Sequence, residues 1–276
     1  MVQSEDSRVD NFVVPLMVGL VRPKNEHPVT AESVEGTGFL LAGGRGLGLT
    51  ARHVAEAIQS TTSVEALVAK ESEIDEARLP AAGFVDSRGF RCAPIVAWDL
   101  HPTEDLALFR LIDDDYYSPY TIDLTKHYGA AEYCLWGYPD DVRYDYFTEE
   151  AQPLNVAFVY SGGHVRRRID RELPISAVRG QKFYELSTPA GACCSGAPVA
   201  VRSNPWQAIG VYVGERRTET GSFAVGFATR ADAIAEQWPQ LVDGSGHLSA
   251  LCPASLTQLA DPSPASRLWA GVNSRL

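Results

Sequence analysis

Short apolar segments separated by turn residues run along most of this chain, and they constrain its fold more than any other feature. The segments have the length of strands, and glycine and proline, present 23 and 17 times, interrupt the series throughout. Strands at such spacing are typical of β-sandwiches and β-barrels. The predicted strands are Phe12–Val21, Gly38–Ala42, Gly48–Thr50, Val64–Ala69, Cys92–Trp98, Leu106–Leu111, Glu132–Gly137, Leu154–Tyr160, Lys182–Ser187, Pro198–Arg202, Ala208–Gly214 and Ser222–Ala228.

Helical patterns are few. Val54–Ile58 predicts a short turn of helix, and Arg230–Trp238 predicts an amphipathic helix that ends before a proline. We therefore expect an all-β protein with a short C-terminal helix. A segment of acidic residues, proline and tyrosine at 113–128 is the expected crossover between a β half at 1–118 and a second half at 119–241. Residues 242–276, rich in Gly, Ser and Pro, are expected to form a tail.

Charge and hydropathy exclude several classes of protein. The net charge is −11, and the one short basic run, Arg166–Arg168, predicts a solvated hairpin and no binding of nucleic acid. The acidic N-terminal residues are unlike a secretory signal, and the apolar run Phe12–Val21 is too short to span a bilayer. We therefore expect no membrane association and a cytoplasmic location. The sequence leaves the oligomeric state open.

Cysteine usage points to a reducing compartment. The five cysteines are an odd number without paired spacing, which argues against a disulfide framework. No CxxC or HExxH pattern occurs, so we expect no metal site.

Three segments have the composition of a nucleophilic active site. In the first, a predicted strand ends in Leu49-Thr50-Ala51-Arg52-His53, which would place the His53 imidazole on rigid backbone as a general base. A surface or satisfied core histidine is an equally good interpretation of His53 taken alone. In the second, Asp105 stands at the head of the apolar strand Leu106–Leu111, where a buried carboxylate needs a partner such as a histidine N–H. Taken alone, a turn aspartate is the commoner interpretation.

The third segment is Gly191-Ala192-Cys193-Cys194-Ser195-Gly196, in which small residues surround a serine just before a strand. Acyl transfer needs an exposed nucleophile and backbone N–H groups directed at the developing oxyanion, and a tight glycine-containing turn can present both. A Ser-Gly pair alone usually marks only a turn. The order His, Asp, Ser, each in the context of an apolar strand, is much more specific than any one segment.

These motifs resemble those of the trypsin-like, chymotrypsin-fold serine peptidases, especially bacterial members of the glutamyl-endopeptidase and HtrA types. The likeness rests on LTARHV around His53, DLAL at Asp105 and SGAPV from Ser195, and it extends over about residues 10–240. The resemblance implies two six-stranded antiparallel β-barrels with the active site between them. It also implies hydrolysis of peptide bonds in a protein or peptide substrate through an acyl-enzyme, without a cofactor.

The same resemblance assigns the site residues. His53, Asp105 and Ser195 would form the catalytic triad, and the backbone N–H groups of Cys193 and Ser195 would form the oxyanion hole. Viral relatives use a cysteine nucleophile followed directly by glycine, and here only Ser195, not Cys194, has that neighbour. The walls of the specificity pocket are expected to be Thr188–Cys193, Tyr212–Glu215 and the strand that starts at Gly221. Its substrate-binding residues would be Thr188, Pro189, Tyr212, Val213, Gly214, Glu215 and Gly221.

The chain departs from the family at several positions. Cys193 stands where the family usually has glycine, so its side chain is expected to oppose the backbone angles of the oxyanion hole. Arg52 replaces a small residue before the histidine, and Cys194 cannot pair with a new N-terminus as the aspartate of zymogens does. Pro189 lies where trypsin-type enzymes carry an aspartate, and Tyr212 where glutamyl-specific relatives keep a histidine. Neither a basic nor an acidic preference is therefore supported.

Three hypotheses follow from these patterns. The first is an active serine endopeptidase acting on a protein substrate, with a single dedicated partner protein left open. The second is a binding or scaffold protein of protease fold whose oxyanion hole is defective at Cys193. The third, a structural β-barrel whose motifs arose by chance, has three ordered matches against it.

Overall fold

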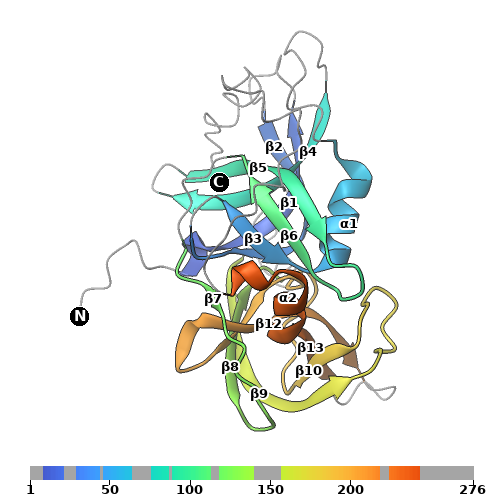
Figure 1. The fold of residues 1–276 in the computed structure, drawn as a ribbon. Helices are drawn as coiled ribbons and strands as arrows, with labels where there is room; N and C mark the ends of the chain where they lie inside the picture. The colour runs from blue at the N-terminus through green and yellow to red at the C-terminus, as the bar shows by residue number, and fades with distance from the viewer. Residues whose placement is uncertain are drawn as a thin grey trace, which may run out of the picture.

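The structure, a computed structural model, describes residues 9–21, 29–43, 46–63, 76–86, 89–112, 118–139, 157–217 and 224–242. Two β-barrels, one above the other in Figure 1, make up most of this part of the chain. The first half contains strands β1 (Val13–Val21), β2 (Val29–Leu40), β3 (Leu47–Thr50), β4 (Ala77–Asp86), β5 (Gly89–Leu100) and β6 (Ala107–Leu111). The second contains β7 (Thr121–Ile122), β8 (Glu132–Gly137), β9 (Val159–Asp170), β10 (Lys182–Leu186), β11 (Pro198–Val201), β12 (Asn204–Arg217) and β13 (Ala224–Arg230).

The first barrel closes in the order β1-β2-β3-β6-β5-β4, with antiparallel pairing throughout. All nine residues of β1 are buried, because this strand packs inside the molecule while pairing with both β2 and β4. Two register shifts along β1 bend the strand as a closing barrel requires. Closure removes the sheet edges that would otherwise bind other chains.

The second barrel is a ring of β8, β9, β10, β13, β12 and β11, and the β11–β12 pairing closes it. The short strand β7 adds to β12 in parallel orientation, with Ala208 opposite Ile122. Two closed six-stranded antiparallel barrels confirm the fold class predicted from the sequence.

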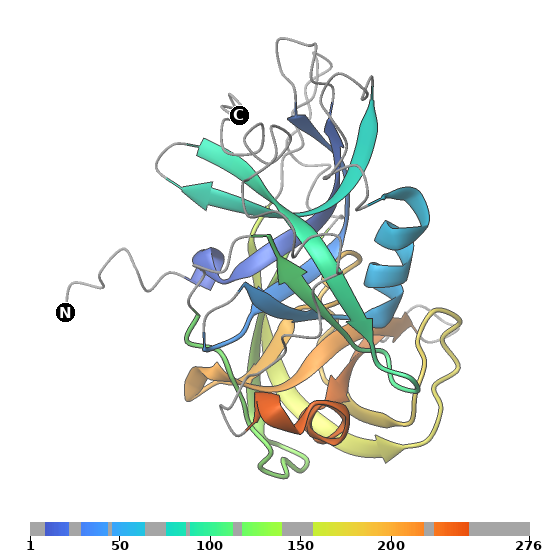
Figure 2. The same cartoon turned by 45° about the horizontal axis from the view of Figure 1, so that its top comes forward.

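Helices lie at the edges of the barrels (Figure 2). Helix α1 (Arg52–Thr61) follows β3, and α2 (Ala231–Gln237) follows β13. Single turns of 3-10 helix occupy Val9–Asn11 and Pro239–Leu241. Helix α1 extends beyond the predicted Val54–Ile58 at both ends, and its buried residues Val54, Ala55 and Ile58 form one apolar stripe. No helix in the described residues is long and apolar enough to cross a membrane.

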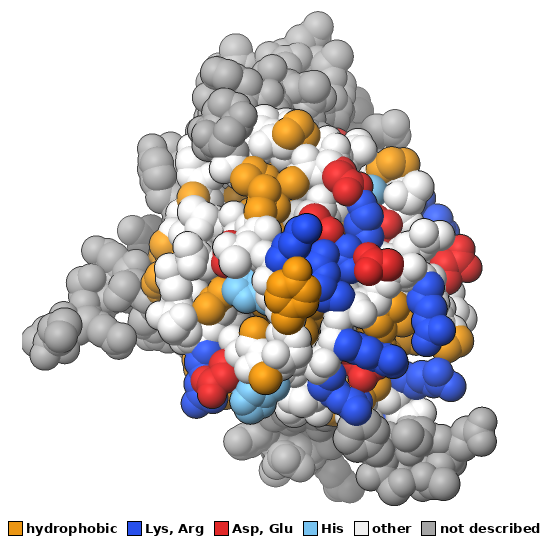
Figure 3. Space-filling model, turned by 60° about the horizontal axis from the view of Figure 1, so that its bottom comes forward, with side chains coloured by type: hydrophobic (Ala, Val, Ile, Leu, Met, Phe, Trp, Pro, Cys, Tyr) orange, Lys and Arg blue, Asp and Glu red, His pale blue; other side chains and the backbone are white. Residues whose placement is uncertain are grey.

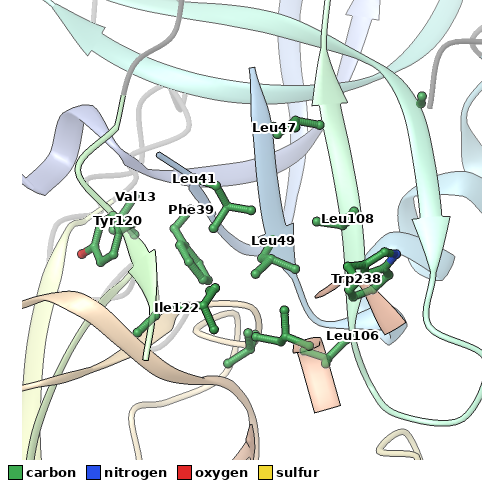
Figure 4. Close-up of a cluster of buried hydrophobic side chains, with 14 of the residues drawn as sticks. Val13, Phe39, Leu41, Leu47, Leu49, Leu106, Leu108, Tyr120, Ile122 and Trp238 are labelled. Atoms are coloured by element: carbon green, nitrogen blue, oxygen red, sulfur yellow. The ribbon is translucent and has the colours of Figure 1, made fainter. Parts of the chain in front are cut away.

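A hydrophobic cluster joins the two barrels (Figure 4). Phe39, Leu49 and Leu108 of the first barrel share this cluster with Ile122 and Trp238 of the second half. All five side chains are at most 8% exposed. Burial on this scale favours a fixed arrangement of the barrels, since separating them would expose these side chains to water.

The basic run lies on strand β9, which pairs antiparallel with β8 and β10; Arg166 and Arg167 are exposed to solvent, as expected, and also form ion pairs. Arg166 and Arg167 of β9 both form ion pairs with the nearly buried Glu185 of β10, and Arg168 pairs with Asp232 of α2. Figure 3 shows acidic side chains interspersed among the Lys and Arg side chains on this face. Ion pairs to the neighbouring strand and to α2 together explain how three successive arginines are accommodated in a β-sheet.

Some expectations fall outside the described residues. They include the predicted strand Val64–Ala69, the pocket residue Gly221, and the tail beyond residue 242. Strand β4 was not predicted, because its sequence ARLPAAGFVD contains a proline and little alternation. The proposed division of the chain at 118/119 and 241/242 stays a prediction.

Candidate active site

The imidazole of His53 and the carboxylate of Asp105 are in direct contact. Asp105 Oδ2 lies 2.7 Å from His53 Nδ1, and Asp105 Oδ1 accepts a hydrogen bond of 3.0 Å from the backbone N–H of His53. The second bond satisfies one of the helix-start N–H groups that lack an acceptor within α1. Asp105 is 1% exposed, whereas the His53 side chain is 24% exposed. With the Nδ1 hydrogen held by the carboxylate, the neutral ring has its Nε2 lone pair available as a base.

Asp105 lies at the end of a loop, residues 101–105, that is fixed from several sides. The guanidinium of Arg52 donates hydrogen bonds to the backbone oxygens of His101 and Pro102, and also to the carboxylate of Glu56. Arg52 stands at the position before the histidine where the trypsin-like peptidases usually have a small residue. Here its side chain ties α1 to the loop that carries Asp105. Its long side chain therefore has a positioning role that the sequence pattern did not reveal.

Two buried side chains of the same loop bind the second barrel. The Nδ1 atom of His101 accepts hydrogen bonds from the N–H groups of Thr103 and Glu104, so Nε2 carries the hydrogen and donates to Ala233 O of α2. The carboxylate of Glu104 accepts the N–H groups of Gln181 and Lys182, at the start of β10. The loop with Asp105 is therefore anchored to both barrels.

Ser195 lies in a tight turn between β10 and β11. The N–H of Cys194 donates to Gly191 O at 3.4 Å, and φ is +95° at Gly191, +63° at Cys193 and +96° at Gly196. A positive φ at the third residue of such a four-residue turn is the feature of type II, where glycine is usual. A residue with a side chain in this conformation costs about 1–2 kcal/mol. Cys193 adopts it nonetheless, although its side chain was expected to oppose it.

Thr37 of the first barrel holds this turn through both its backbone and its side chain. Its N–H donates to Ser195 O at 2.8 Å, and its hydroxyl donates to Cys193 O at 2.9 Å. The same hydroxyl accepts the N–H of Tyr138. Thr37 therefore connects strand β2, the turn and the residue after β8, and it offsets part of the strain at Cys193.

Backbone also approaches backbone at Gly196. A Cβ at this position would overlap the oxygen of Thr37 and the hydroxyl of Thr50, and the Gly196 N–H donates to Tyr212 O at 2.7 Å. A Cβ on Gly36 would come within 2.9 Å of Ser195 O and within 2.7 Å of Val54, the residue after His53. Gly36 thus lies between the segment with the histidine and the turn with the serine. Within the described residues, no hydrogen bond joins the Ser195 hydroxyl to the His53 ring.

The residues predicted to bind substrate differ widely in burial. Thr188 and Pro189 are half-buried, Tyr212 and Val213 are buried, and Glu215 is half-buried. Val213 belongs to the hydrophobic cluster that contains Val54 and Ile58. Gly214, with φ of +141°, marks a register shift between β12 and β13.

Comparisons with known proteins identify the fold. No protein-family model and no curated protein sequence matches the chain. Among solved structures, the MamO protease domain from Magnetospirillum magneticum is similar over 84% of this chain and 98% of its own, with TM-score 0.53 and 15% identity. The active form of the Rv3671c protease from M. tuberculosis gives 84% and 82%, with TM-score 0.51 and 15% identity. The fold is that of the trypsin-like protease domains.

A third solved structure extends the likeness to the HtrA type. The HtrA-type protease AlgW with a decapeptide covers 86% of this chain and 66% of its own, with TM-score 0.54 and 16% identity. The trypsin-like fold brings His53 and Asp105 together, as predicted. Sequence reasoning missed Thr37, His101 and Glu104, because each acts through a partner that is distant along the chain. The one signal for Thr37 in the sequence is its place between two glycines, Gly36 and Gly38, at the start of a predicted strand.

Proposed function

We propose that this protein is a serine endopeptidase that hydrolyses peptide bonds through an acyl-enzyme at Ser195. The observation that carries the proposal is the His53–Asp105 pair, with a buried carboxylate 2.7 Å from the Nδ1 of a partly exposed imidazole. A buried aspartate that orients a histidine is the arrangement that makes the histidine a general base for a serine. The tight turn around Ser195, bound by Thr37, supports the choice of nucleophile.

In the proposed reaction, the Ser195 hydroxyl transfers its proton to His53 Nε2 while its oxygen attacks the peptide carbonyl carbon. Asp105 stabilises the resulting imidazolium. The N–H groups of Cys193 and Ser195 donate hydrogen bonds to the oxyanion. His53 then gives the proton to the leaving amine. A water molecule gives a proton to His53 as it attacks the acyl carbon, and His53 returns this proton to the Ser195 oxygen as the acid product leaves. The substrate is a protein or peptide, and no cofactor takes part.

A second candidate is a binding protein of protease fold with an impaired oxyanion hole. It is favoured by the positive φ of Cys193, a conformation that glycine adopts more readily, and by the lack of a hydrogen bond between Ser195 and His53 in the described residues. This candidate requires the turn to lose its shape or the serine to stay unactivated when a peptide binds.

Labelling with a fluorophosphonate probe tests the first proposal. We expect the wild-type chain to be labelled, and Ser195→Ala and His53→Ala each to abolish labelling and turnover with the midpoint of thermal unfolding nearly unchanged. Ser60→Ala is the matched control, because this hydroxyl is exposed near the end of α1 and, among the described residues, donates its hydrogen bond to Ala57 O. A folded wild-type chain that resists labelling would reject the enzyme.

The variant Cys193→Gly separates the two candidates. If the wild type is active, removing the side chain should change the labelling rate by no more than about 30-fold, since a left-handed residue with a side chain costs about 1–2 kcal/mol. If the wild type is inert and Cys193→Gly becomes labelled at Ser195, the binding protein is the better description.

A further inference from the structure

Tyr212 occupies the region between the predicted walls of the specificity pocket. Strand β12 pairs with β13 so that Tyr212 is opposite Ala228 and Glu215 is opposite Gly226. A Cβ on Gly226 would come within 2.8 Å of the Tyr212 ring and within 3.0 Å of Thr188 O. The ring therefore lies beside the wall segments around residues 188 and 226, where a substrate side chain would have to fit.

Hydrogen bonds hold the Tyr212 ring in this place. Its hydroxyl accepts the N–H of Ala190 at 3.0 Å and lies 3.4 Å from the Glu215 carboxylate, to which it donates. Tyr212 is 0% exposed, and burial raises the pKa of its phenol, so the hydroxyl remains a donor at any physiological pH. Displacing the ring would leave the Ala190 N–H without this acceptor.

Glu215 connects the pocket walls at the level of the Ser195 turn. The same carboxylate oxygen that meets Tyr212 also accepts the N–H of Gly191 at 3.2 Å. Its other oxygen is 3.9 Å from the exposed guanidinium of Arg217. The end of β12 is thereby tied to the segment that leads into Ser195.

We propose that Tyr212 and Glu215 fill the specificity pocket of this chain, so that it cleaves after small residues such as Gly, Ala and Ser. The inference rests on the proposed peptidase function. A large substrate side chain would have to displace the fully buried Tyr212 ring and break its bond to Ala190 and the Glu215 bond to Gly191. A small side chain would bind at the pocket entrance without displacing either residue. This explains why neither a basic nor an acidic preference is visible in the sequence.

The test uses the full chain and peptidyl phosphonate probes that differ only in the residue at the cleavage position: Ala, Phe, Lys or Glu. We expect the wild type to react with the Ala probe at least about 100-fold faster than with the others, the scale on which a pocket rejects a group that does not fit. Tyr212→Ala should raise the Phe-to-Ala ratio at least about tenfold. Tyr212→Phe, which keeps the ring, should retain the preference for Ala.

Glu215→Ala provides a second test if Tyr212→Ala does not fold, because Glu215 is half-buried and its loss removes less packing. We expect it to raise the rate for a Val probe relative to Ala. If the wild type reacts equally fast with the Ala and Phe probes, the filled pocket is wrong, while the proposed peptidase function still stands. A preference for Lys, with Glu215 as its counter-ion, would overturn it as well. If the wild type reacts with neither these probes nor the fluorophosphonate, the proposed function fails, and this inference fails with it.

Discussion

The loop that carries Asp105 and the turn that carries Ser195 are held by different kinds of interaction. The loop at 101–105 is fixed by buried side chains that bind the second barrel, His101 to α2 and Glu104 to β10, and its described residues all have ordinary φ. The turn at 191–196 contains three residues with positive φ and is held from the other barrel by strand β2, through two hydrogen bonds from Thr37 and a contact between the Cys193 thiol and Val34 O. The acid–base pair is thus prearranged by side chains, whereas the nucleophile depends on backbone conformation.

This difference has a chemical reason. A carboxylate and an imidazole must keep one relative orientation throughout the reaction, and buried side-chain hydrogen bonds provide it. A nucleophile must be exposed and flanked by N–H groups that point outward, which regular strands cannot offer. Strain at such positions is what a compact turn requires.

The largest expected effect concerns the Asp105–His53 pair. Asp105→Asn should lower kcat/KM about 10⁴-fold, because an amide does not hold His53 in the tautomer with Nε2 as acceptor. Glu104→Gln is the matched control: it is adjacent and buried, and its amide oxygen still accepts the N–H groups of Gln181 and Lys182. Peptidase assays on both variants measure the effect. Equal losses in the two variants would show that the loop, and not the Asp105 carboxylate, matters.

The next largest effect concerns the backbone of the turn. Gly196→Ala should lower the free energy of unfolding by more than about 3 kcal/mol, because its Cβ would overlap Thr37 O and its φ is +96°. Gly43→Ala is the control, since φ there is +106° but nothing lies within 4 Å of the added Cβ. It should cost only about 1–2 kcal/mol. Urea unfolding of both variants gives the comparison, and similar losses would contradict the close approach at Gly196.

Substituting Thr37 should have a smaller effect on stability, and one that depends on its hydroxyl. Thr37→Val keeps the shape but removes the hydroxyl that binds Cys193 O and Tyr138 N–H, and we expect a loss of about 1–3 kcal/mol in unfolding free energy. Thr37→Ser keeps the hydroxyl and should restore most of it. Fluorophosphonate labelling should slow in Thr37→Val more than in Thr37→Ser. An unchanged labelling rate in Thr37→Val would mean that the hydroxyl has no part in positioning the turn.

The smallest expected effect is a pH dependence of the free energy of unfolding that arises from His101 in the loop at 101–105. Burial lowers the pKa of His101 in the folded state, and this outweighs the opposite influence of Ala233 O and Glu104. The unfolded chain, with an ordinary pKa of about 6.5, therefore binds more protons as the pH falls. The stabilising contribution of neutral His101 is complete above that pH and is lost as the pH falls through the folded-state pKa.

Unfolding measured from pH 8 to pH 5 tests this contribution. The wild type should lose stability more steeply than His101→Asn, which cannot titrate. The difference between the two proteins at pH 8 isolates the neutral hydrogen bonds to Thr103, Glu104 and Ala233. Parallel curves for the two proteins would show that protonation of His101 does not oppose folding.

The sequence by itself determined much of the architecture. Apolar segments and turn residues predicted the β class, the order of His53, Asp105 and Ser195 predicted a trypsin-like fold, and the structure confirmed the fold and the contact between His53 and Asp105. These features were readable because strand periodicity and turn chemistry are local properties. The roles of Ser195, Cys193 and the pocket residues stay predictions that the experiments above address.

Only the tertiary structure decided how the site is supported and how the predicted pocket is filled. Thr37 meets Cys193 across 156 positions of sequence, His101 meets Ala233 across 132, and the ring of Tyr212 packs against Gly226 on the neighbouring strand. Nothing in the composition of these segments predicts such contacts. They arise because barrel closure and the packing of the two barrels bring distant backbone groups within hydrogen-bonding distance, where a buried donor or acceptor must find a partner.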